Sequence, residues 1–321
     1  GNGKTSDHAV IGGMYLITNN AAPKLNIPGD TAIEVGETLN LSTGYTAVDA
    51  EDGNLTEEIE VSGTVNTRIP GNYTVTYSVT DSDGNTVTKT RVIGVSDLST
   101  FSQLKAEDDR KVSAQNGYGS MGINVSNGGN ALRLTAEDGS IVTYELGLGV
   151  HADSTVVYDI SDGDYDFFTV DAGVDRECYG NSNTSLRMYI YCDGELRYDS
   201  GILTSKMPLD QVKISVKGVS ELKLVVDDLG GNANDHADWC DMRLYYNQAV
   251  DPDSYRKGDV NGDGAIDVID MECIQKDLLG ITKLTGQNYL AAHVVSLITA
   301  DISVLDMEAI QKHILGIQRI E

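Results

Sequence analysis

The sequence predicts a mainly β protein built from several modules, and three observations support this prediction. Its 321 residues suffice for two or three domains of ordinary size, each with its own core. The chain has 16 Tyr and 34 Gly but only 3 Phe and 1 Trp, a balance that suits short strands joined by tight turns. Alternating apolar and polar residues, separated by turn residues, recur over most of its length. We therefore expect two β-sandwiches followed by a small helical unit.

The charge of the chain excludes two classes of partner. The formal net charge is -26, from 23 basic and 49 acidic residues. Nucleic acid and anionic membrane surfaces both require clustered Lys and Arg, so neither is an expected partner. No apolar run approaches the length of a membrane span, and the N-terminus lacks a signal-peptide pattern. We expect a soluble fragment, with any export signal upstream.

Residues 1–23 have no sustained period and are assigned no fold, whereas residues 24–95 show a pattern of strands and turns. Apolar residues alternate with Thr and Ser ahead of "DSDGN" (81–85), whose residues tolerate the positive φ of a hairpin turn. About 70 residues of this kind form a small sandwich. The alternating residues are Tyr73, Val75, Tyr77 and Val79.

The phrases "GYTAVDAEDGNLT" and "PGNYTVTYSVTDSDGNTVTKT" resemble bacterial Ig-like modules, over nearly the whole of residues 24–95. Such modules serve as spacers in secreted surface enzymes, so the resemblance implies a spacer. Within this region Asp49, Glu51 and Asp52 form an acidic cluster. The cluster is either an ordinary polar turn or a calcium site.

A second β-rich region covers residues 99–248. Turn residues recur about every ten positions, which favours one antiparallel sandwich over a βαβ fold. Nothing in the region predicts a long helix. The expected strands lie within residues 154–160, 167–175, 185–203 (around a Cys-Asp-Gly turn), 212–216, 221–228 and 242–246.

The four cysteines, Cys178, Cys192, Cys240 and Cys273, are too few and too scattered for a disulfide scaffold. None belongs to a Cys-x-x-Cys zinc pair. Cys178 and Cys192 could flank a hairpin and pair, but sparse buried cysteine is more commonly a free thiol. We expect free thiols.

Residues 100–247 contain no nucleophile elbow, phosphate loop or zinc pair, and no spacing singles out a glycosidase carboxylate pair, so we expect no catalysis there. Four unusual phrases stand out instead: "AQNGYGSM" (114–121), "GLGVHADSTVVYD" (147–159), "AGVDREC" (172–178) and "NDHADWCDMRL" (234–244). In this order and spacing they closely resemble the NPCBM family of carbohydrate-binding modules, a galactose-binding-like β-sandwich attached to glycoside hydrolases. The resemblance implies binding of terminal galactose or related sugars.

A sugar site needs an aromatic face for the C–H patches of the ring and short polar groups for its hydroxyls. The phrases supply the candidates Asn116, Tyr118, His151, Asp235, His236, Asp238 and Trp239. Three of them have a second interpretation. His151 could instead bond backbone inside the sandwich, and Tyr118 could be an ordinary surface residue. In a regular strand Trp239 lies opposite to Cys240 and Met242, which favours a ligand or calcium-loop role over core packing.

Residues 259–270 have the spacing of a twelve-residue calcium loop. Oxygen-bearing side chains recur at alternate positions, and Gly264 occupies position 6, where the turn needs glycine. A polar turn without metal would not place a glycine and six oxygen donors in register with a following helix. The expected Ca²⁺ ligands are Asp259, Asn261, Asp263, the Ala265 carbonyl, Asp267 and Asp270.

The loop is followed by a helical pattern that is repeated within residues 302–317. Gly280 and Gly316 are each placed to end a helix. Two loop–helix units of this kind at a chain terminus resemble a type I dockerin, the module that docks onto cohesin domains; the resemblance covers residues 257–321. The expected apolar faces are Met271, Ile274, Leu278 and Ile281, and Met307, Ile310, Ile314 and Ile317.

The second copy departs from the dockerin pattern. When Asp306 is aligned with Asp270, apolar or small residues occupy the loop positions that need carboxylates and glycine. Apolar side chains cannot replace carboxylates around a divalent cation, so this loop should bind no calcium. Leu297 and Ile298 would instead add apolar packing between the copies. The substituted positions are Val295, Leu297, Thr299 and Ala300.

The dockerin resemblance places partner-selecting side chains at loop positions 10 and 11 and along the first part of each helix. Apolar pairs at these positions favour a hydrophobic contact, and the loss of symmetry puts two-way docking in doubt. Because a module of this size has only a small hydrophobic core, we expect removal of the metal to unfold it. The cohesin-contacting candidates are Val268, Ile269, Lys276, Val304, Leu305 and Lys312.

Together these features predict a non-catalytic accessory region of a secreted, multimodular bacterial glycoside hydrolase, consisting of a spacer, a module for galactose-containing glycans and a calcium-dependent dockerin. Tethering to both a substrate and a scaffold would raise local concentration. The alternative is a non-enzymatic lectin or adhesin that uses the same sugar site for attachment. The two hypotheses differ in what precedes Gly1.

Overall fold

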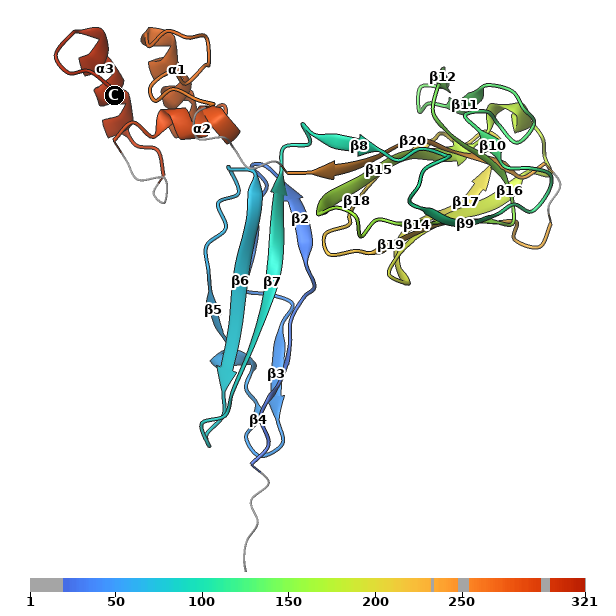
Figure 1. Ribbon diagram of the computed structural model, residues 1–321, viewed down its shortest axis with the longest axis horizontal. Coiled ribbons are helices and arrows are strands. Elements are labelled where there is room, and N and C mark those ends of the chain that lie inside the picture. Colours follow the sequence, from blue (N-terminus) through green and yellow to red (C-terminus); the bar gives the residue numbers. More distant parts are fainter. Residues whose placement is uncertain (1–19, 232–233, 248–253, 296–300, 321) are drawn as a thin grey trace, which may run out of the picture. The chain divides into compact units, whose positions relative to one another are not determined.

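The computed structural model describes residues 20–231, 234–247, 254–295 and 301–320. The fold is mainly β, as expected, with three short helices near the C-terminus (Figure 1). The segment 1–19, which was assigned no fold, lies outside the described residues. In the part of the chain that is described, no helix is both long and apolar enough to cross a membrane.

The predicted hairpin in the Ig-like region is confirmed. Strands β6 (Gly71–Thr80) and β7 (Thr86–Ser96) flank the turn at residues 81–85. The Asp81 carboxylate accepts hydrogen bonds from the backbone amides of Asp83 and Asn85 at 3.0 and 2.7 Å, and Gly84 supplies the positive φ of 89°. Val75, Tyr77 and Val79 are buried, as their alternation predicts.

This region forms a three-stranded sheet of order β1-β3-β4 and a four-stranded sheet of order β2-β7-β6-β5. The acidic cluster adopts an ordinary turn, in which Asp49 Oδ1 accepts hydrogen bonds from the amides of Glu51 (2.8 Å) and Asp52 (3.1 Å). The remaining elements are β1 (Lys24–Asn26), β2 (Thr31–Glu34), β3 (Thr46–Asp49), β4 (Gly53–Asn54), the 3-10 turn η1 (Thr56–Glu58) and β5 (Glu60–Ser62).

The central region is an antiparallel sandwich, as predicted. One sheet has the order β10-β13-β20-β15-β18, with β8 also paired to β20, and the other has the order β17-β16-β19-β14-β9. The strands are β8 (Phe101–Gln103), β9 (Lys111–Gln115), β10 (Gly122–Ile123), β11 (Leu132–Thr135), β12 (Ile141–Tyr144), β13 (Gly147–His151), β14 (Ser154–Asp159), β15 (Tyr165–Val174), β16 (Ser185–Cys192), β17 (Glu195–Thr204), β18 (Asp210–Ser215), β19 (Glu221–Asp227) and β20 (His236–Tyr246).

A β-bulge in β20 overturns the expectation for Trp239. Asp171 pairs with Cys240 and Thr169 with Arg243, so two residues of β20 stand opposite Val170 alone, and Asp241 has a φ of +50°. The extra residue reverses the alternation of side chains along the strand. Trp239 and Met242 consequently face the same core and are both fully buried. The prediction that Trp239 lies away from the core applied to a regular strand and was wrong.

Cys240 faces the other side of the sheet, where the β11–β12 hairpin covers it. Its side chain packs with Leu132 and Leu134 in a separate small cluster. Strand β20 therefore contributes to two apolar layers, one on each face. All four cysteines are free thiols, as predicted, and Cys178, Cys192 and Cys240 are buried.

The C-terminal part contains α1 (Val268–Leu278), α2 (Gly286–Ala292) and α3 (Val304–Ile314), of which α2 was not predicted. Gly280 and Gly316 follow the ends of α1 and α3 with φ of 69° and 68°. The amide of Ile281 donates to the Lys276 carbonyl at 2.9 Å, and that of Ile317 donates to the Lys312 carbonyl at 2.8 Å. Both helices therefore end as expected, in glycine-terminated caps.

The apolar faces predicted for these helices are right at their beginnings and wrong at their ends. Met271, Ile274, Met307 and Ile310 pack in the core of this part. Leu278 and Ile314, in contrast, are 39% exposed, Ile281 is 67% exposed and Ile317 is 69% exposed. Leu278 and Ile314 are the last residues of their helices, and Ile281 and Ile317 follow the helices, where the chain has already turned.

Candidate functional site

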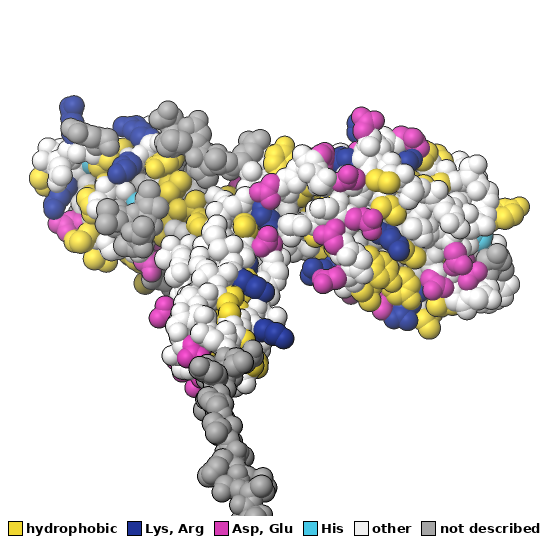
Figure 2. Space-filling model, turned by 60° about the horizontal axis from the view of Figure 1, so that its bottom comes forward, with side chains coloured by type: hydrophobic (Ala, Val, Ile, Leu, Met, Phe, Trp, Pro, Cys, Tyr) yellow, Lys and Arg dark blue, Asp and Glu magenta, His cyan; other side chains and the backbone are white. Residues whose placement is uncertain are grey.

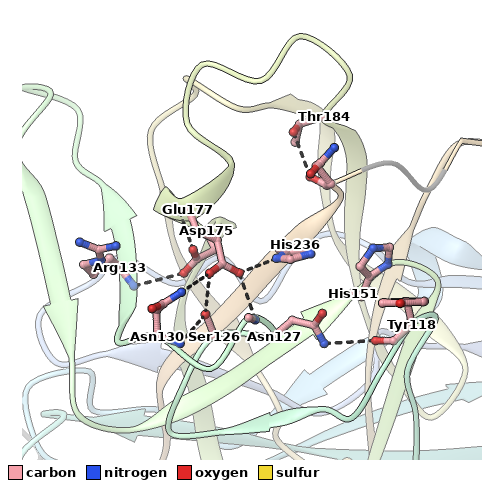
Figure 3. Close-up of polar contacts among 12 residues, drawn as sticks. Tyr118, Ser126, Asn127, Asn130, Arg133, His151, Asp175, Glu177, Thr184 and His236 are labelled. Carbon is pink, nitrogen blue, oxygen red and sulfur yellow. Dashed lines mark hydrogen bonds and ion pairs between the residues drawn. The ribbon is translucent and has the colours of Figure 1, made fainter.

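Two histidines and a tyrosine meet at one end of the central sandwich. His151 ends β13 and is paired in register with His236, the first residue of β20. Their ring centroids lie 5.0 Å apart, and the Tyr118 ring lies 5.7 Å from that of His151 (Figure 3). Tyr118 is 71% exposed, whereas His151 is only 5% exposed. The three residues form a small patch with an exposed aromatic ring beside two imidazoles.

The hydrogen bonds of the two imidazoles determine their tautomers. His151 Nδ1 lies 2.6 Å from the carbonyl oxygen of Ala152, which can only accept, so this nitrogen carries the proton. His236 Nδ1 donates in the same way to the carboxylate of Glu177. A ring whose single proton is on Nδ1 has a lone pair on Nε2. The site therefore offers two adjacent hydrogen-bond acceptors.

Glu177 organises the surrounding loop. Its Oε1 accepts hydrogen bonds from the Gly128 amide (3.1 Å) and from His236, and its Oε2 accepts from Ser126 (3.0 Å) and Asn130 (2.9 Å). Burial raises the pKa of Glu177, but the hydrogen bonds from Asn130, His236 and Ser126 outweigh it, so the net pKa is lowered. These four donors occupy the main acceptor positions of the carboxylate. Glu177 is thus a positioning group more than a free ligand.

Two glycines make this arrangement possible. A Cβ on Gly149 of β13 would collide with the backbone of Val125 and Ser126, and one on Gly128 would collide with the carboxylate of Glu177. Only glycine permits such close approach. The loop therefore lies directly on the sheet and presents Ser126 to Glu177.

Asn116 and Asn127 hold the loop that carries Tyr118. Asn116 Oδ1 accepts a hydrogen bond from the His151 amide at 2.8 Å, and its Nδ2 donates to the Tyr118 carbonyl at 2.7 Å. Asn127 Nδ2 donates to the carbonyls of Tyr118 (3.2 Å) and Ser120 (3.1 Å). Both amides support the position of Tyr118, so we assign Asn116 a supporting role.

The other three sugar-binding candidates are fully buried. Asp235 accepts a hydrogen bond from the Ser185 amide at 2.8 Å, and burial raises its pKa. Asp238 lies in the middle of the six-stranded sheet, and Trp239 belongs to the main core. The structure thus brings Tyr118, His151 and His236 together, with Tyr118 exposed and His151 buried beside it, and places Asp235, Asp238 and Trp239 in the interior.

Four residues of this site were not predicted from the sequence: Glu177, Ser126, Asn127 and Asn130. Glu177 sits in the 3-10 turn η2 (Arg176–Cys178), whose N-cap is Asp175, and the Glu177 amide donates to Asp175 at 2.6 Å. The phrase "AGVDREC" contains the one available signal: its Asp175 is a preferred N-cap residue and would have predicted an ordered turn at residues 176–178.

Comparison with known families covers the two β regions. Residues 99–245 match the family described as NPCBM/NEW2 domain, and residues 23–95 match the family described as bacterial surface protein, Ig-like domain. The central sandwich belongs to the NPCBM/NEW2 family. No curated protein matches the chain.

Several solved structures resemble the chain in its NPCBM/NEW2 domain and beyond. CBM51 from Clostridium perfringens GH95, in complex with methyl-galactose, is 36% identical over 46% of this chain and 100% of that one, with a TM-score of 0.43. CBM51-2 with GlcNAc and INT domains from Clostridium perfringens ZmpB is 32% identical over 79% of this chain, with a TM-score of 0.47. The chain covers 52% of that structure. A structure of the M60 catalytic domain with CBM51-1 and CBM51-2 from the same ZmpB is 36% identical over 70% of this chain, with a TM-score of 0.45, and the chain covers 23% of it.

Three carboxylates at the surface of the NPCBM/NEW2 domain lie close together. The oxygens of Asp153, Asp227 and Asp228 lie within 4.8 Å of one another. Asp153 is exposed and Oδ1 of its carboxylate already accepts a hydrogen bond from the Asp228 amide at 2.8 Å. Exposed acidic groups of this kind are common without a metal, and we assign no site to them.

Outside the NPCBM/NEW2 domain, the loop at 259–270 has oxygen ligands suited to a hard cation. Asp259 Oδ1 is buried and has no hydrogen-bond partner among the described residues, while its Oδ2 accepts from the Gly264 amide at 2.9 Å. Asp270 is fully buried and accepts from the amides of Val260 (2.6 Å), Asn261 (3.1 Å) and Asp267 (2.8 Å). A buried carboxylate oxygen without a hydrogen-bond partner in the described part of the chain, such as Asp259 Oδ1, surrounded by other oxygen-bearing side chains, fits a site for a calcium ion.

The second loop is described only in part. Leu297, Ile298, Thr299 and Ala300 lie outside the described residues, and Val295 is 56% exposed. Asp306 keeps the position of Asp270: it is buried and accepts a hydrogen bond from the Ser303 amide at 2.9 Å. The copied helix thus retains the carboxylate that caps it.

The candidates for partner contact lie on the surface of α1 and α3, in a part of the molecule where Figure 2 shows hydrophobic side chains at the surface. Val268 and Ile269 are 62% and 45% exposed, and their counterparts Val304 and Leu305 are 61% and 59% exposed. Lys276 pairs with Glu272, and Lys312 with Glu308, each at 2.8 Å. The two helices therefore present nearly the same surface.

Proposed function

We propose that the NPCBM/NEW2 domain binds the terminal sugar of galactose-containing glycans through Tyr118, His151 and His236. The observation that carries this proposal is the pair of Nε2 acceptors beside an exposed aromatic ring. Two neighbouring hydroxyls of a sugar donate to the imidazoles while its C–H face lies on Tyr118. The carboxylate of Glu177 behind them favours a neutral sugar over an acidic one.

The proposed role is binding without catalysis. Glu177, the carboxylate nearest to the two imidazoles, is saturated by four donors and has a lowered pKa, so it does not serve as a general acid. Incubation of a galactoside with the chain should therefore release no reducing sugar.

A glycan array followed by titration calorimetry tests the sugar proposal. Terminal galactose and N-acetylgalactosamine should bind, N-acetylglucosamine serves as a comparison because a related module was solved with it, and a sialylated galactoside should not bind. His236→Ala should abolish binding, and Tyr191→Ala, a change of a tyrosine on β16, should not affect it. Uniform silence on the array would reject the proposal.

For the C-terminal part we propose a calcium-dependent, dockerin-like module that docks onto a cohesin domain. Asp259, Asn261, Asp263, the Ala265 carbonyl, Asp267 and Asp270 would hold the ion. Calcium would supply charge neutralisation and cross-link the loop to α1. The orphaned Asp259 oxygen and the exposed apolar pairs on α1 and α3 support this proposal.

Calcium titration of the full chain should reveal one tight site in this part, which Asp259→Ala combined with Asp263→Ala should remove. Two equal sites here would contradict the assignment of the second loop. Docking is tested by native gels with a panel of type I cohesins. The double change Val268→Asp and Ile269→Asp on α1 should weaken the complex with cohesin while leaving the calcium isotherm unchanged. The double change Val304→Asp and Leu305→Asp tests in the same way whether α3 also contacts cohesin.

We infer that the chain is an accessory region of a secreted bacterial glycoside hydrolase in which the sugar site and the docking module raise the local concentration of an enzyme near its substrate. The alternative is a lectin or adhesin without an enzyme. The complete reading frame separates these two, since only the first requires a catalytic domain in the same polypeptide.

A further inference from the structure

Asp238 is a buried carboxyl group without an ordinary partner. It lies in β20 between Gly149 of β13 and Gly173 of β15, and it is fully buried. Among the described residues neither of its oxygens has a hydrogen-bond donor. An isolated buried carboxylate is costly, because burial removes the hydration of its charge. Asp238 must therefore be neutralised in some way.

A second buried carboxyl, Asp175, lies on the same face of the sheet as Asp238. Gly173 is the register partner of Asp238, Asp175 follows it two residues later, and the Asp175 amide donates to the His236 carbonyl at 3.0 Å. Asp175 is 1% exposed. Asp175 already acts as an acceptor: Oδ1 accepts from the Glu177 amide at 2.6 Å and Oδ2 from the Arg133 amide at 3.4 Å. Ionisation of two adjacent buried carboxyls at once has a high free-energy cost, and such pairs commonly share one proton. Since Asp175 is the acceptor, the proton belongs on Asp238.

We propose that Asp238 is a neutral carboxylic acid that donates a hydrogen bond to Asp175 and thereby positions the turn that carries Glu177 in the sugar site. The proposal rests on the proposed function of that site. It makes Asp238 a positioning residue, connected to the sugar through Asp175, Glu177 and His236.

The electrostatic surroundings favour the neutral form. Burial raises the pKa of Asp238 well above its ordinary value, with further increases from Asp175 and Glu177, and the Arg133 amide acts in the opposite direction. Further titratable groups on this side are the buried Cys240 thiol, Asp171 of β15, which accepts a hydrogen bond from Tyr144, and His236, whose Nδ1 is committed to Glu177. In the described part of the chain neither Asp175 nor Asp238 forms an ion pair with a basic side chain.

Alkaline pH should therefore loosen the site. When Asp238 loses its proton, two negative charges face each other behind η2, and Asp175 loses its donor. The cap of η2 weakens and Glu177 no longer holds His236 and the loop at 126–130 in place. Sugar affinity should fall as the pH rises through the pKa of Asp238.

Asp238→Asn in the full chain tests this inference, because its amide remains a neutral donor. The variant should bind galactose as the wild type does at neutral pH and keep that affinity at alkaline pH. Asp238→Ala should bind roughly tenfold more weakly at every pH, since the donor is lost. Asp175→Asn moves the donor to the other side of the pair and should also remove the alkaline loss.

A measurement without sugar separates this inference from the proposed function. The infrared difference spectrum between wild type and Asp238→Asn should show the carbonyl band of one protonated carboxyl in the wild type. If this band is present but no glycan on the array binds, the proposed sugar binding is rejected, whereas the protonated state of Asp238 is still supported. The inference would be overturned by the absence of this band or by equal pH profiles for wild type and Asp238→Asn. A band that disappears when Ca²⁺ is added would also overturn it, because a cation would then take the place of the proton.

Discussion

His151 and His236 stand side by side on adjacent strands, with ring centroids 5.0 Å apart and each Nδ1 committed to an acceptor. This relationship leaves two neighbouring Nε2 acceptors, in rings whose planes are tilted by 58°. His151→Phe and His236→Phe each keep an aromatic ring but remove one acceptor, so we expect either change to weaken galactose binding in titration calorimetry. Unchanged affinity in both variants would contradict the assigned tautomers.

The Glu177 carboxylate should contribute to stability in a pH-dependent way. Its pKa in the folded protein is lowered, so its contribution is present above its unfolded value of about 4.3 and is lost as the pH falls through the folded value. Glu177→Gln should cost about 1–3 kcal/mol of unfolding free energy at neutral pH, because buried donors lose their acceptor. The difference from wild type should shrink towards pH 3 in urea unfolding. A constant difference would mean that charge is not involved.

Tyr118 and Trp239 should respond to substitution in opposite ways. Tyr118→Ala removes a side chain that is 71% exposed and should leave the melting temperature almost unchanged while sugar affinity is lost. Trp239→Ala leaves a cavity in the core and should cost about 3–5 kcal/mol. Thermal melts and titrations of both variants check this. Retained stability in Trp239→Ala would argue against the bulge in β20.

The four thiols should differ in reactivity. Burial raises the pKa of Cys178 and Cys192 to about 11 and that of Cys240 further, so little thiolate forms at neutral pH. Cys273 is partly exposed and should react first with a thiol reagent. One fast equivalent under native conditions and four after unfolding are expected, measured by absorbance. The Cys273→Ser variant serves as the control and should lose the fast equivalent.

The β-sandwich class could be predicted because it depends on local alternation and turn chemistry. Val75, Tyr77 and Val79 alternate and are buried, and the turn at Asp81 has the residues that its backbone requires. Helix ends in the C-terminal part were equally predictable, since Gly280 and Gly316 provide the positive φ that the caps need. These features are encoded within a few neighbouring residues.

The site was only partly predictable because it depends on distant contacts. Tyr118, His151 and His236 were found from unusual phrases, but Glu177 becomes important only when η2 meets the loop at Ser126. The burial of Trp239 depends on a bulge at Asp241, a non-glycine residue with positive φ that nothing in "WCDMRLYY" announces. The hydrophobic period alone also continues past Gly280, where the chain leaves the helix, which is why Ile281 was misplaced.

The bulge at Asp241 uncouples the two halves of β20. Residues before it can be exchanged to change what the imidazole end of the strand recognises, while the residues after it keep their inward or outward orientation. Deletion of Asp241 would do the reverse: it would turn Trp239 and Cys240 over together, sending an indole beneath the β11–β12 hairpin and a thiol into the space that the indole had filled. One extra residue thus lets recognition diverge in this strand without repacking its far end.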